Sequence, residues 1–366
     1  MNEYTFLKPA KGFFDGIGAK DKVFLYFDKD GDGLTAGAIV SELLDEKGIA
    51  YVPYPAQDGD RSAYLEIFGR ELKKHRFTAF ISCDIGFDGG EVFGFFEKNK
   101  IKPLIIDHHS LNKNVPAFVQ YVNPRLELPS EKNPSSSAIA YAVYRFLGGR
   151  KDLKWLGYIG AYTDVMALQS REFLELDGKE ANSFMPNGQP MSLYGMAHVI
   201  GSSAYLNPRL GLLVFKLLKE SVRENNPILV WQEADGKAKP LFKAMNDGER
   251  EARKWLNRLG KKGLGFVDRE KKLVYFKMVK PRLTIKRVAG ALLGIKFPGY
   301  TTLAAIDDGK RINSSNRSPS VDLSKAIPKA LEGIPNAEGG GHPGAAGCSF
   351  PKEYEKKFIE QFKALL

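Results

Sequence analysis

Short apolar runs alternate with amphipathic stretches along the first 110 residues. The runs Val23–Phe27 and Leu104–Ile106 are continuously apolar, which is typical of strands buried on both faces of a parallel sheet. Between such runs, apolar residues recur at helical spacing; Leu65, Phe68 and Leu72 are one example. The pattern predicts a doubly wound parallel sheet, with strands at 23–27, 50–54, 78–82 and 104–106 and helices at 35–48, 62–76 and 91–98.

A helical region and a second α/β pattern follow. Ser135–Ser137 is expected to cap a helix that reaches Leu147, and further helices are predicted at 153–168, 209–222 and 246–259. Asn246 and Glu249 have the spacing of a capping box. Beyond Gly260 the pattern predicts strands at 265–268, 272–278, 301–307, 311–315 and 346–350, helices at 285–293, 321–331 and 353–366, and a glycine-rich turn before the last strand.

These patterns divide the chain into three expected parts. Residues 1–175 form an N-terminal α/β domain, residues 176–260 a helical connecting segment, and residues 261–366 a smaller C-terminal α/β domain. A chain of 366 residues with 43% hydrophobic content is long enough for two or three domains with cores of their own.

The basic charge of the chain is concentrated in one segment. The net charge is +11, yet residues 237–296 alone hold 18 Lys or Arg against 5 Asp or Glu, so the remainder is slightly acidic. A basic segment beside an acidic one suits a protein that holds and cleaves a polyanion. The alternative, a solvated helical face rich in lysine, stays equally open on charge alone.

The cysteine content and the hydropathy of the sequence indicate where in the cell we expect the protein. The two cysteines, Cys83 and Cys348, lie far apart and have no CxxC spacing, which argues against a disulfide framework and fits a reducing cytoplasm. The sequence shows no signal peptide and no run that approaches about 18 apolar residues, so we expect a soluble cytoplasmic protein without a membrane partner.

Acidic residues and histidines follow the predicted strands of the N-terminal domain. Asp28-x-Asp30-x-Asp32-Gly follows the first strand, Asp84 the third, and Asp107-His108-His109 the fourth, which begins after a turn at Lys102-Pro103. Parallel strands bring such groups to one edge of the sheet, and three carboxylates at alternate positions of an extended stretch share a face. An EF-hand loop is disfavoured because Ile39 occupies its twelfth position and a strand precedes it.

This set of ligands indicates divalent ions. Carboxylate and imidazole without thiolate suit Mn²⁺ or Mg²⁺, and two such ions would serve a phosphoryl displacement. Asp164 extends the set, because an acidic residue in an otherwise apolar helix costs free energy to bury unless it is paired or metal-bound. Exposure of Asp164 to solvent is the alternative, which we favour less because its neighbours look buried on every side.

The C-terminal part carries a second constellation. Asn316-Arg317-Ser318 follows a predicted strand, and Gly339-Gly340-Gly341-His342 precedes another. Glycine-rich backbone can approach a phosphate closely, and a guanidinium offers a planar fork for phosphate oxygens. With Arg317 and His342 in one small domain, we expect an anion site there.

The order of these motifs resembles the DHH phosphoesterase superfamily. Several features resemble its RecJ-like single-strand exonucleases of the compact archaeal type, namely Asp28 where oligoribonuclease relatives usually have His, Thr163–Leu168, Leu206–Gly211 and Asn316–Ser318. The resemblance implies a DHH catalytic domain and a smaller DHH-associated domain, with the active site in the cleft between them.

The resemblance also implies roles for single residues. The ligands of one ion would be Asp28, Asp30 and Asp84. The ligands of the other would be Asp32, Asp84, His108 and Asp164, so that Asp84 bridges the two. Asp107 would orient an imidazole, and His109 would contact the scissile phosphate. The adjacent nucleotide phosphate would be held by Arg317, Ser318, Gly340, Gly341 and His342.

The resulting expectation is a two-metal exonuclease that uses Mn²⁺ or Mg²⁺ and releases mononucleotides from single-stranded DNA or RNA. Its RecJ-like character implies a role in DNA repair or replication and association with GINS-type replication proteins. One alternative is an oligoribonuclease or cyclic-dinucleotide phosphodiesterase. The other is a non-catalytic replication scaffold of the Cdc type, which the complete set of ligand positions disfavours.

Overall fold

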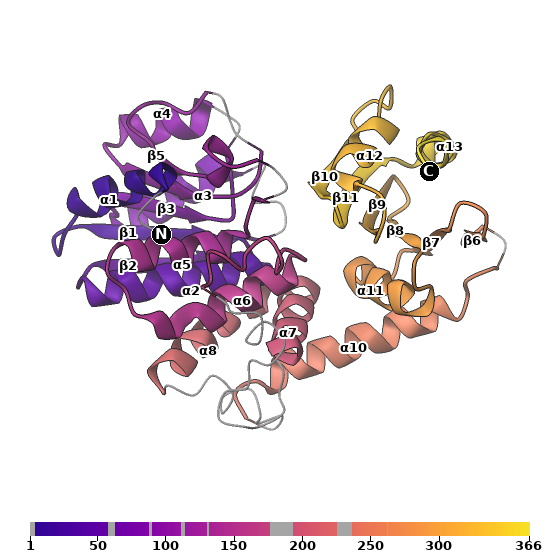
Figure 1. Cartoon of the computed structure of the whole chain (residues 1–366), viewed down its shortest axis with the longest axis horizontal. Helices are drawn as coiled ribbons and strands as arrows, with labels where there is room; N and C mark the ends of the chain where they lie inside the picture. Colours follow the sequence, from indigo (N-terminus) through magenta and orange to yellow (C-terminus); the bar gives the residue numbers. More distant parts are fainter. Residues whose placement is uncertain are drawn as a thin grey trace. The chain divides into compact units, whose positions relative to one another are not determined.

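The structure is a computed structural model that describes residues 4–57, 63–87, 90–110, 114–129, 132–175, 193–224, 236–261 and 263–366. The chain divides into two compact units, Met1–Phe242 and Lys243–Leu366, each with a sheet of its own (Figure 1). Within the described residues, no helix combines the length and the apolar character that a membrane span needs.

The first unit is built on a five-stranded parallel sheet in the order β2-β1-β3-β4-β5. Its strands are β1 (Lys22–Phe27), β2 (Ala50–Pro55), β3 (Ala79–Cys83), β4 (Lys102–Ile106) and β5 (Gln120–Val122). The predicted parallel sheet is confirmed. β5 was not predicted, because three residues are too few to show a periodic pattern.

Helices cover both faces of this sheet, as the doubly wound pattern predicted (Figure 1). Aromatic side chains of β1 and β3 pack with Phe68 and Phe96 of the helices on one face. On the other face α2 is buried almost along its whole length, between the sheet and α5, α6 and α8. The helices are α1 (Lys8–Asp15), α2 (Gly31–Glu46), α3 (Tyr64–His75), α4 (Gly90–Lys98), α5 (Ser136–Phe146), α6 (Lys154–Thr163), α7 (Leu193–Leu206) and α8 (Gly211–Arg223), and α10 (Lys239–Leu256) begins in this unit and ends in the second.

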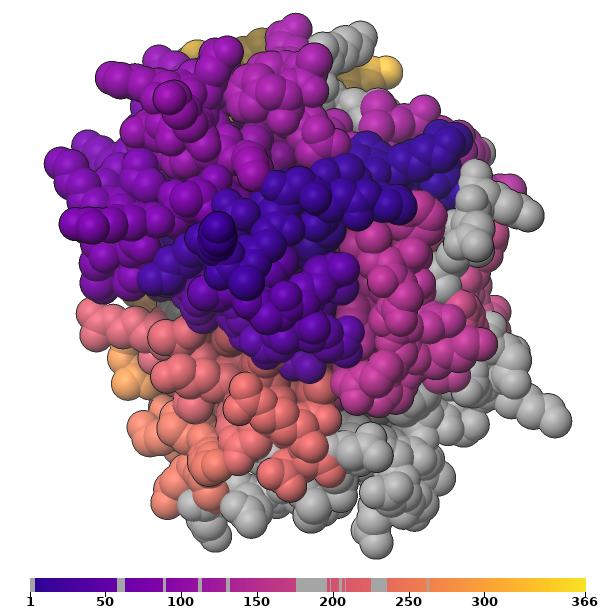
Figure 2. Space-filling view, turned by 90° about the vertical axis from the view of Figure 1, so that its left-hand side faces the viewer, coloured from indigo at the N-terminus to yellow at the C-terminus, as the bar shows by residue number. Residues whose placement is uncertain are grey.

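The N-terminal residues lie across the surface of the first unit. α1, which the sequence pattern did not predict, packs against β4 and β5. The carboxylate of Glu127 accepts hydrogen bonds from the backbone N–H groups of Thr5 and Phe6, at 3.2 and 3.0 Å. Figure 2 shows this indigo segment crossing between the purple and magenta parts of the unit. It therefore covers the edge of the sheet at β5.

The strand order places a topological switch point between β1 and β3. The chain leaves β1 toward β2 on one side, whereas it leaves β3 toward β4 and β5 on the other. Loops that diverge in this way leave a crevice at the carboxyl ends of the strands, where open α/β sheets bind ligands. Asp28 follows β1 and Asp84 follows β3, so both lie at this crevice.

The second unit holds a six-stranded sheet in the order β10-β11-β9-β8-β7-β6; β7 and β8 pair in parallel, and the other neighbouring strands that the structure describes pair antiparallel. One face packs on α12 and α13, and α11 lies on the other, where Gly290 approaches Ala304 and Ser315. Its elements are β6 (Gly265–Asp268), β7 (Leu273–Val279), α11 (Lys286–Lys296), β8 (Thr301–Asp307), β9 (Arg311–Arg317), α12 (Leu323–Ala330), β10 (Glu338–His342), β11 (Ala345–Pro351) and α13 (Glu355–Ala364). The predicted α/β character of this part is confirmed.

Several predicted boundaries are wrong, each for a local reason. α2 begins at Gly31 instead of Thr35, because the side chain of Asp30 caps it. Lys102 and Pro103 belong to β4 and form no turn. Asn246 lies in the interior of α10, which begins at Lys239, so the capping box does not exist. The glycine-rich segment 338–342 is strand β10 instead of a turn.

Candidate functional site

Three carboxylates converge at the switch point. Asp28, Asp30 and Asp84 each offer an oxygen within 4.8 Å of the others. The backbone N–H of Asp28 donates to the carbonyl of Cys83 at 3.2 Å, which ties the loop after β1 to the end of β3. The predicted meeting of these strand-end residues is therefore present in the structure.

The geometry of the first motif differs from the prediction. Asp28-x-Asp30-x-Asp32 is not extended, since Asp30 caps α2 and Asp32 lies in its first turn. One carboxylate oxygen of Asp30 accepts from the N–H groups of Asp32 and Gly33, at 3.1 and 3.2 Å. A Cβ on Gly33 would lie 2.5 Å from the carbonyl oxygen of Asp28, so this tight turn requires glycine. The carboxylates share a side of the crevice because of the cap, not because of strand alternation.

Asp32 is held by the N-terminus of α5. Its two carboxylate oxygens accept from the backbone N–H groups of Ser136 and Ser137, at 2.7 and 3.0 Å. The positive end of the helix dipole favours a carboxylate here. Even so, complete burial and then the charge of Asp164 raise the pKa of Asp32 to about 7, which outweighs the lowering by Ser137. The folded chain therefore concentrates negative charge at a cost that a cation would offset.

Asp84 is the most constrained of these carboxylates. Its backbone adopts a left-handed conformation, with φ +63°, and its N–H donates to the carbonyl of Ile106 at 2.9 Å. The side chain is buried, and its Oδ1 has no hydrogen-bond partner among the described residues. Burial and the charges of Asp32, Asp30 and Asp28 raise the pKa of Asp84 well above its ordinary range. A strained backbone that holds an unsatisfied carboxylate is typical of a functional site.

The two adjacent histidines have different partners. The Nδ1 of the buried His108 lies 3.0 Å from the carbonyl oxygen of Pro134, which leaves Nε2 toward Asp84 and Asp164, at 3.3 and 3.6 Å. The Nδ1 of His109 lies 2.7 Å from Oδ1 of Asp107, and its side chain is 49% exposed. One imidazole thus faces into the carboxylate cluster, and the other stands at its exposed rim.

Asp107 and His109 form an ion pair. Burial would raise the pKa of Asp107, but the charge and hydrogen bond of His109 and the charge of His108 lower it below its ordinary value. Partial desolvation would lower the pKa of His109, but the charge and hydrogen bond of Asp107 raise this pKa to about 9. In the metal-free fold the pair therefore presents a positively charged ring at neutral pH.

Asp164 does not lie inside a helix. It is the C-cap of α6, and its exposed neighbours Val165 and Leu168 correct the prediction that it is surrounded by buried residues. Its side chain nevertheless offers a ligand atom within 4.8 Å of those of Asp32 and His108. The carboxylate of Asp164 therefore lies at the cluster, although α6 ends one residue before it.

The cluster fits divalent cations. One set of possible ligands is Asp28, Asp30 and Asp84, and another is Asp32, His108 and Asp164. Oxygen and imidazole donors are those that Mn²⁺ and Mg²⁺ accept, and the buried Oδ1 of Asp84 still has a lone pair to offer. Burial, and after it the repulsion between the carboxylates, raises the pKa values of Asp32 and Asp84, and a bound cation would offset both effects.

The predicted anion-binding residues of the second unit lie on adjacent strands. His342 pairs with Ala345, which pairs with Arg317, so that one row of β10, β11 and β9 carries both side chains on one face. Gly341 has φ +146°, and a Cβ there would lie 2.6 Å from the carbonyl oxygen of Ala345. Gly340 has open space where a Cβ would stand, so a ligand can approach its backbone closely.

Ser318 has a structural role in this fold. Its hydroxyl accepts from the N–H groups of Ser320 and Val321, at 3.3 and 2.9 Å, and lies 2.8 Å from the hydroxyl of Thr301. These contacts fix the turn that follows Arg317. These contacts do not test the prediction that Ser318 contacts the substrate, which stays a prediction.

The comparisons with known proteins follow the same division of the chain. The model of the DHH family, N-terminal domain, matches residues 22–168, and that of the DHHA1 domain matches residues 270–366. The chain belongs to the DHH superfamily. A comparison of this DHH protein with curated proteins found no significant match.

Solved structures show that this DHH protein has a RecJ-like fold. RecJ from Thermus thermophilus, in complex with Mn²⁺, has 17% identity and a TM-score of 0.69 over 98% of this chain and 54% of its own, so this chain spans about half the length of that RecJ. An exonuclease RecJ bound to manganese has 17% identity and a TM-score of 0.63 over 99% of this chain and 94% of its own. CDC45 from Entamoeba histolytica has 12% identity and a TM-score of 0.58, with 98% and 99% covered. At these identities the likeness shows the fold alone.

Three residues that hold the D-H-H segment of this DHH protein were missed by the sequence analysis. The carbonyl of His108 accepts from Arg125 Nε and Asn133 Nδ2, at 3.0 and 2.7 Å, and that of His109 accepts from Asn123 Nδ2 at 3.1 Å. Asn and Arg residues carry no sequence signal for such a role. The Asn-Pro-Arg-Leu pattern, which begins a short 3₁₀-helix both here and at residues 207–210, is the one local cue.

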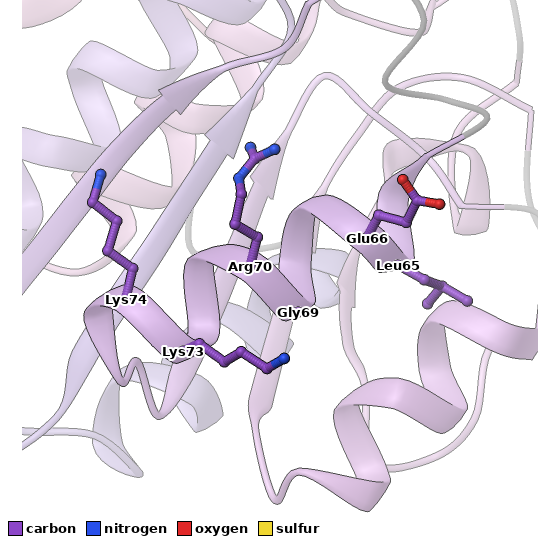
Figure 3. A pocket seen from close by; sticks show the side chains of 6 residues that line it. All are labelled: Leu65, Glu66, Gly69, Arg70, Lys73 and Lys74. Carbon is purple, nitrogen blue, oxygen red and sulfur yellow. The ribbon is translucent and has the colours of Figure 1, made fainter.

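A separate pocket opens on the outer face of α3, with a volume of about 630 Å³ (Figure 3). Its lining residues are Leu65, Glu66, Gly69, Arg70, Lys73 and Lys74. They come from successive turns of one exposed helix, and none of them belongs to the carboxylate cluster. The pocket is a shallow surface feature that brings no chemical groups to the cluster.

Proposed function

We propose that this protein is a metal-dependent exonuclease that hydrolyses phosphodiester bonds of single-stranded DNA or RNA to mononucleotides. The observation that carries the proposal is the meeting of six potential ligands at the switch point of the sheet, with Asp84 between the two ligand sets. In this proposal each ligand set would hold one ion, Mn²⁺ or Mg²⁺, and Asp84 would be a ligand of both. The likeness to RecJ structures that contain Mn²⁺ or Mg²⁺ supports the choice of ions.

In this proposal the residues of the first unit have different roles in the reaction. Divalent ions, when bound, supply Lewis acidity toward a phosphodiester and lower the pKa of water. The carbonyl of Pro134 holds His108 so that Nε2 faces the cluster. Asp107 keeps the ring of His109 oriented, so that its exposed edge can contact a phosphate oxygen. N–H groups of α5 fix the carboxylate of Asp32 in one position.

The second unit supplies phosphate contacts in this proposal. Arg317 and His342 share a face of the sheet, beside the open backbone of Gly340. The basic segment 237–296 adds a surface for the strand, since the acidic residues Asp247, Glu249 and Glu251 are each paired with a cation and a surplus of basic residues remains. Cytoplasmic location, a role in repair or replication and binding to GINS-type proteins stay predictions.

A chain-length series of end-labelled single strands in Mn²⁺ tests the proposal. We expect progressive shortening of long strands to mononucleotides, protection of duplexes, and no turnover by the Asp84→Asn variant. Much faster turnover of two- to five-residue oligonucleotides than of long strands would favour the oligoribonuclease alternative. Binding of DNA without hydrolysis in Mn²⁺, Mg²⁺ or Co²⁺ would favour the scaffold. Labels at the 5′ end and at the 3′ end report the polarity.

A further inference from the structure

A strained residue stands immediately after the candidate ligand Asp164. Val165 has φ +59°, and its N–H donates to the carbonyl of Tyr162 at 3.2 Å, while the N–H of Met166 donates to that of Ala161 at 2.7 Å. This is a helix C-terminal motif whose left-handed position usually holds glycine. Among the described non-glycine residues with positive φ, Val165 is the one that is β-branched. A β-branched residue is especially unfavourable in this conformation.

Packing in the core does not compensate this strain. The side chain of Val165 is 53% exposed. Two further large apolar side chains nearby are also exposed, Tyr162 by 37% and Leu168 by 72%, whereas Met166 between them is buried. The stretch 162–168 contains no Lys or Arg. An exposed apolar rim, formed by Tyr162, Val165 and Leu168, therefore lies beside Asp164.

The cluster is open to solvent at Asp164, which lies beside this rim, and also at His109 and Asp28. Asp32, Asp107 and His108 are at most 1% exposed, so a ligand cannot reach the cluster past them. The side chains of Asp164 and His109 are 21% and 49% exposed. A phosphate that enters beside Asp164 brings its attached nucleoside toward the residues that flank Asp164 in the chain.

We infer that Val165, together with Tyr162 and Leu168, contacts the nucleobase of the nucleotide whose phosphate lies at the metal cluster. The inference rests on the proposed function and adds a determinant of substrate class to it. A base is the part of a nucleotide that an apolar rim without cations can bind, because a phosphate would require positive charge. Contact with a base explains why the chain has a valine in a left-handed conformation that strains valine but would not strain glycine.

The test compares Val165→Gly with the wild-type protein on two single strands in Mn²⁺. One strand carries normal bases, and the other carries an abasic sugar at its terminal residues. In the wild type, we expect kcat/KM to be about fivefold to a hundredfold higher on the normal strand, the range of a base contact. In Val165→Gly this preference should be severalfold smaller, because the rate on the normal strand falls toward the wild-type rate on the abasic strand while Tyr162 and Leu168 remain. Leu65→Ser removes an exposed leucine on α3 and should keep the wild-type preference.

A second readout does not depend on turnover. Val165→Gly removes backbone strain and should raise the melting temperature by about 2 °C, yet lower the affinity for thymidine 5′-monophosphate in Mn²⁺ without changing that for deoxyribose 5-phosphate. If the wild type shortens both strands equally and binds both small molecules equally, the inference is overturned while the proposed exonuclease stands. If the wild type shortens neither strand, the proposed function fails, and equal binding of the two small molecules would then overturn the inference as well.

Discussion

Replacing Asp84 by asparagine should stabilise the metal-free protein and abolish its response to metal. Asparagine keeps the size of the side chain and tolerates the left-handed backbone of this position, which alanine does not. The substitution removes one negative charge from a group of carboxylates that repel each other. The expected gain of stability in the absence of ions is the reverse of what most buried substitutions do.

The size of the gain follows from the geometry. Oxygens of Asp84, Asp28 and Asp30 lie within 4.8 Å of one another, and at an effective dielectric constant of about 20 each pair of charges would repel by roughly 3.5 kcal/mol. Uptake of a proton limits this cost, because protonating a carboxylate at pH 7 from an ordinary pKa of 3.8 costs about 4 kcal/mol. Asp84→Asn should therefore add between about 1 and 4 kcal/mol to the free energy of unfolding at pH 7 to 8.

The pH dependence has a definite sign. A carboxyl whose pKa is raised in the folded state favours folding below its unfolded pKa, and this advantage is lost as pH rises toward the folded pKa. The difference between Asp84→Asn and the wild type should thus be small near pH 4 and grow toward pH 8.

Thermal unfolding with a chelator and with Mn²⁺, at both pH values, measures these effects. At a free Mn²⁺ concentration of about 100 times the dissociation constant, the wild type should gain about 2.7 kcal/mol. The variant should gain much less. A variant that is less stable than the wild type in chelator at pH 8 would refute the repulsion argument. Equal shifts with Mn²⁺ would refute the assignment of Asp84 as a ligand.

Three further predictions concern other residues. Asp107→Asn should destabilise the metal-free fold most between about pH 4 and 6.5 and progressively less as pH rises from about 6.5 through about 9, because the low pKa of Asp107 and the raised pKa of His109 both report their ion pair; equal destabilisation at pH 6 and pH 10 in urea titrations would count against the pair. Arg317→Ala should weaken binding of a labelled strand at low salt and lower the salt slope by about one, whereas Lys356→Ala, which removes an 89% exposed cation of the same unit, should not; identical slopes would exclude a phosphate contact. Ser135→Ala removes the cap of α5 and should cost about 1 kcal/mol in chemical denaturation, with unchanged stability contradicting the capping role.

The sequence pattern predicted the strands better than the ends of the helices. Continuous apolar runs identify β1, β3 and β4, because a strand buried on both faces has no polar position to obscure the pattern. The beginning of α2 was misplaced because Asp30, Asp32 and the glycines between and after them are weak helix formers that a side-chain cap holds in place. The end of α6 was misplaced because a valine occupies the left-handed position where glycine would have marked the boundary.

The candidate site could be predicted by residue type but not by geometry. Asp28, Asp84 and His108 follow apolar runs, so their convergence follows from the parallel sheet. The hydrogen bonds from α5 to the carboxylate of Asp32 could not be predicted, because their donors are backbone N–H groups more than 100 residues away in the chain. The role of Asn133 is equally invisible, because it acts through a carbonyl that every residue possesses.

The ligand sets also bear on how the protein is made. They combine residues from the ends of β1, β3, β4 and α6, so the last candidate ligand, Asp164, is synthesised 136 residues after the first, Asp28. A nascent chain on the ribosome cannot complete both sets until that residue has emerged. Under the proposed two-ion function, a chain that terminates before Asp164 would therefore lack nuclease activity.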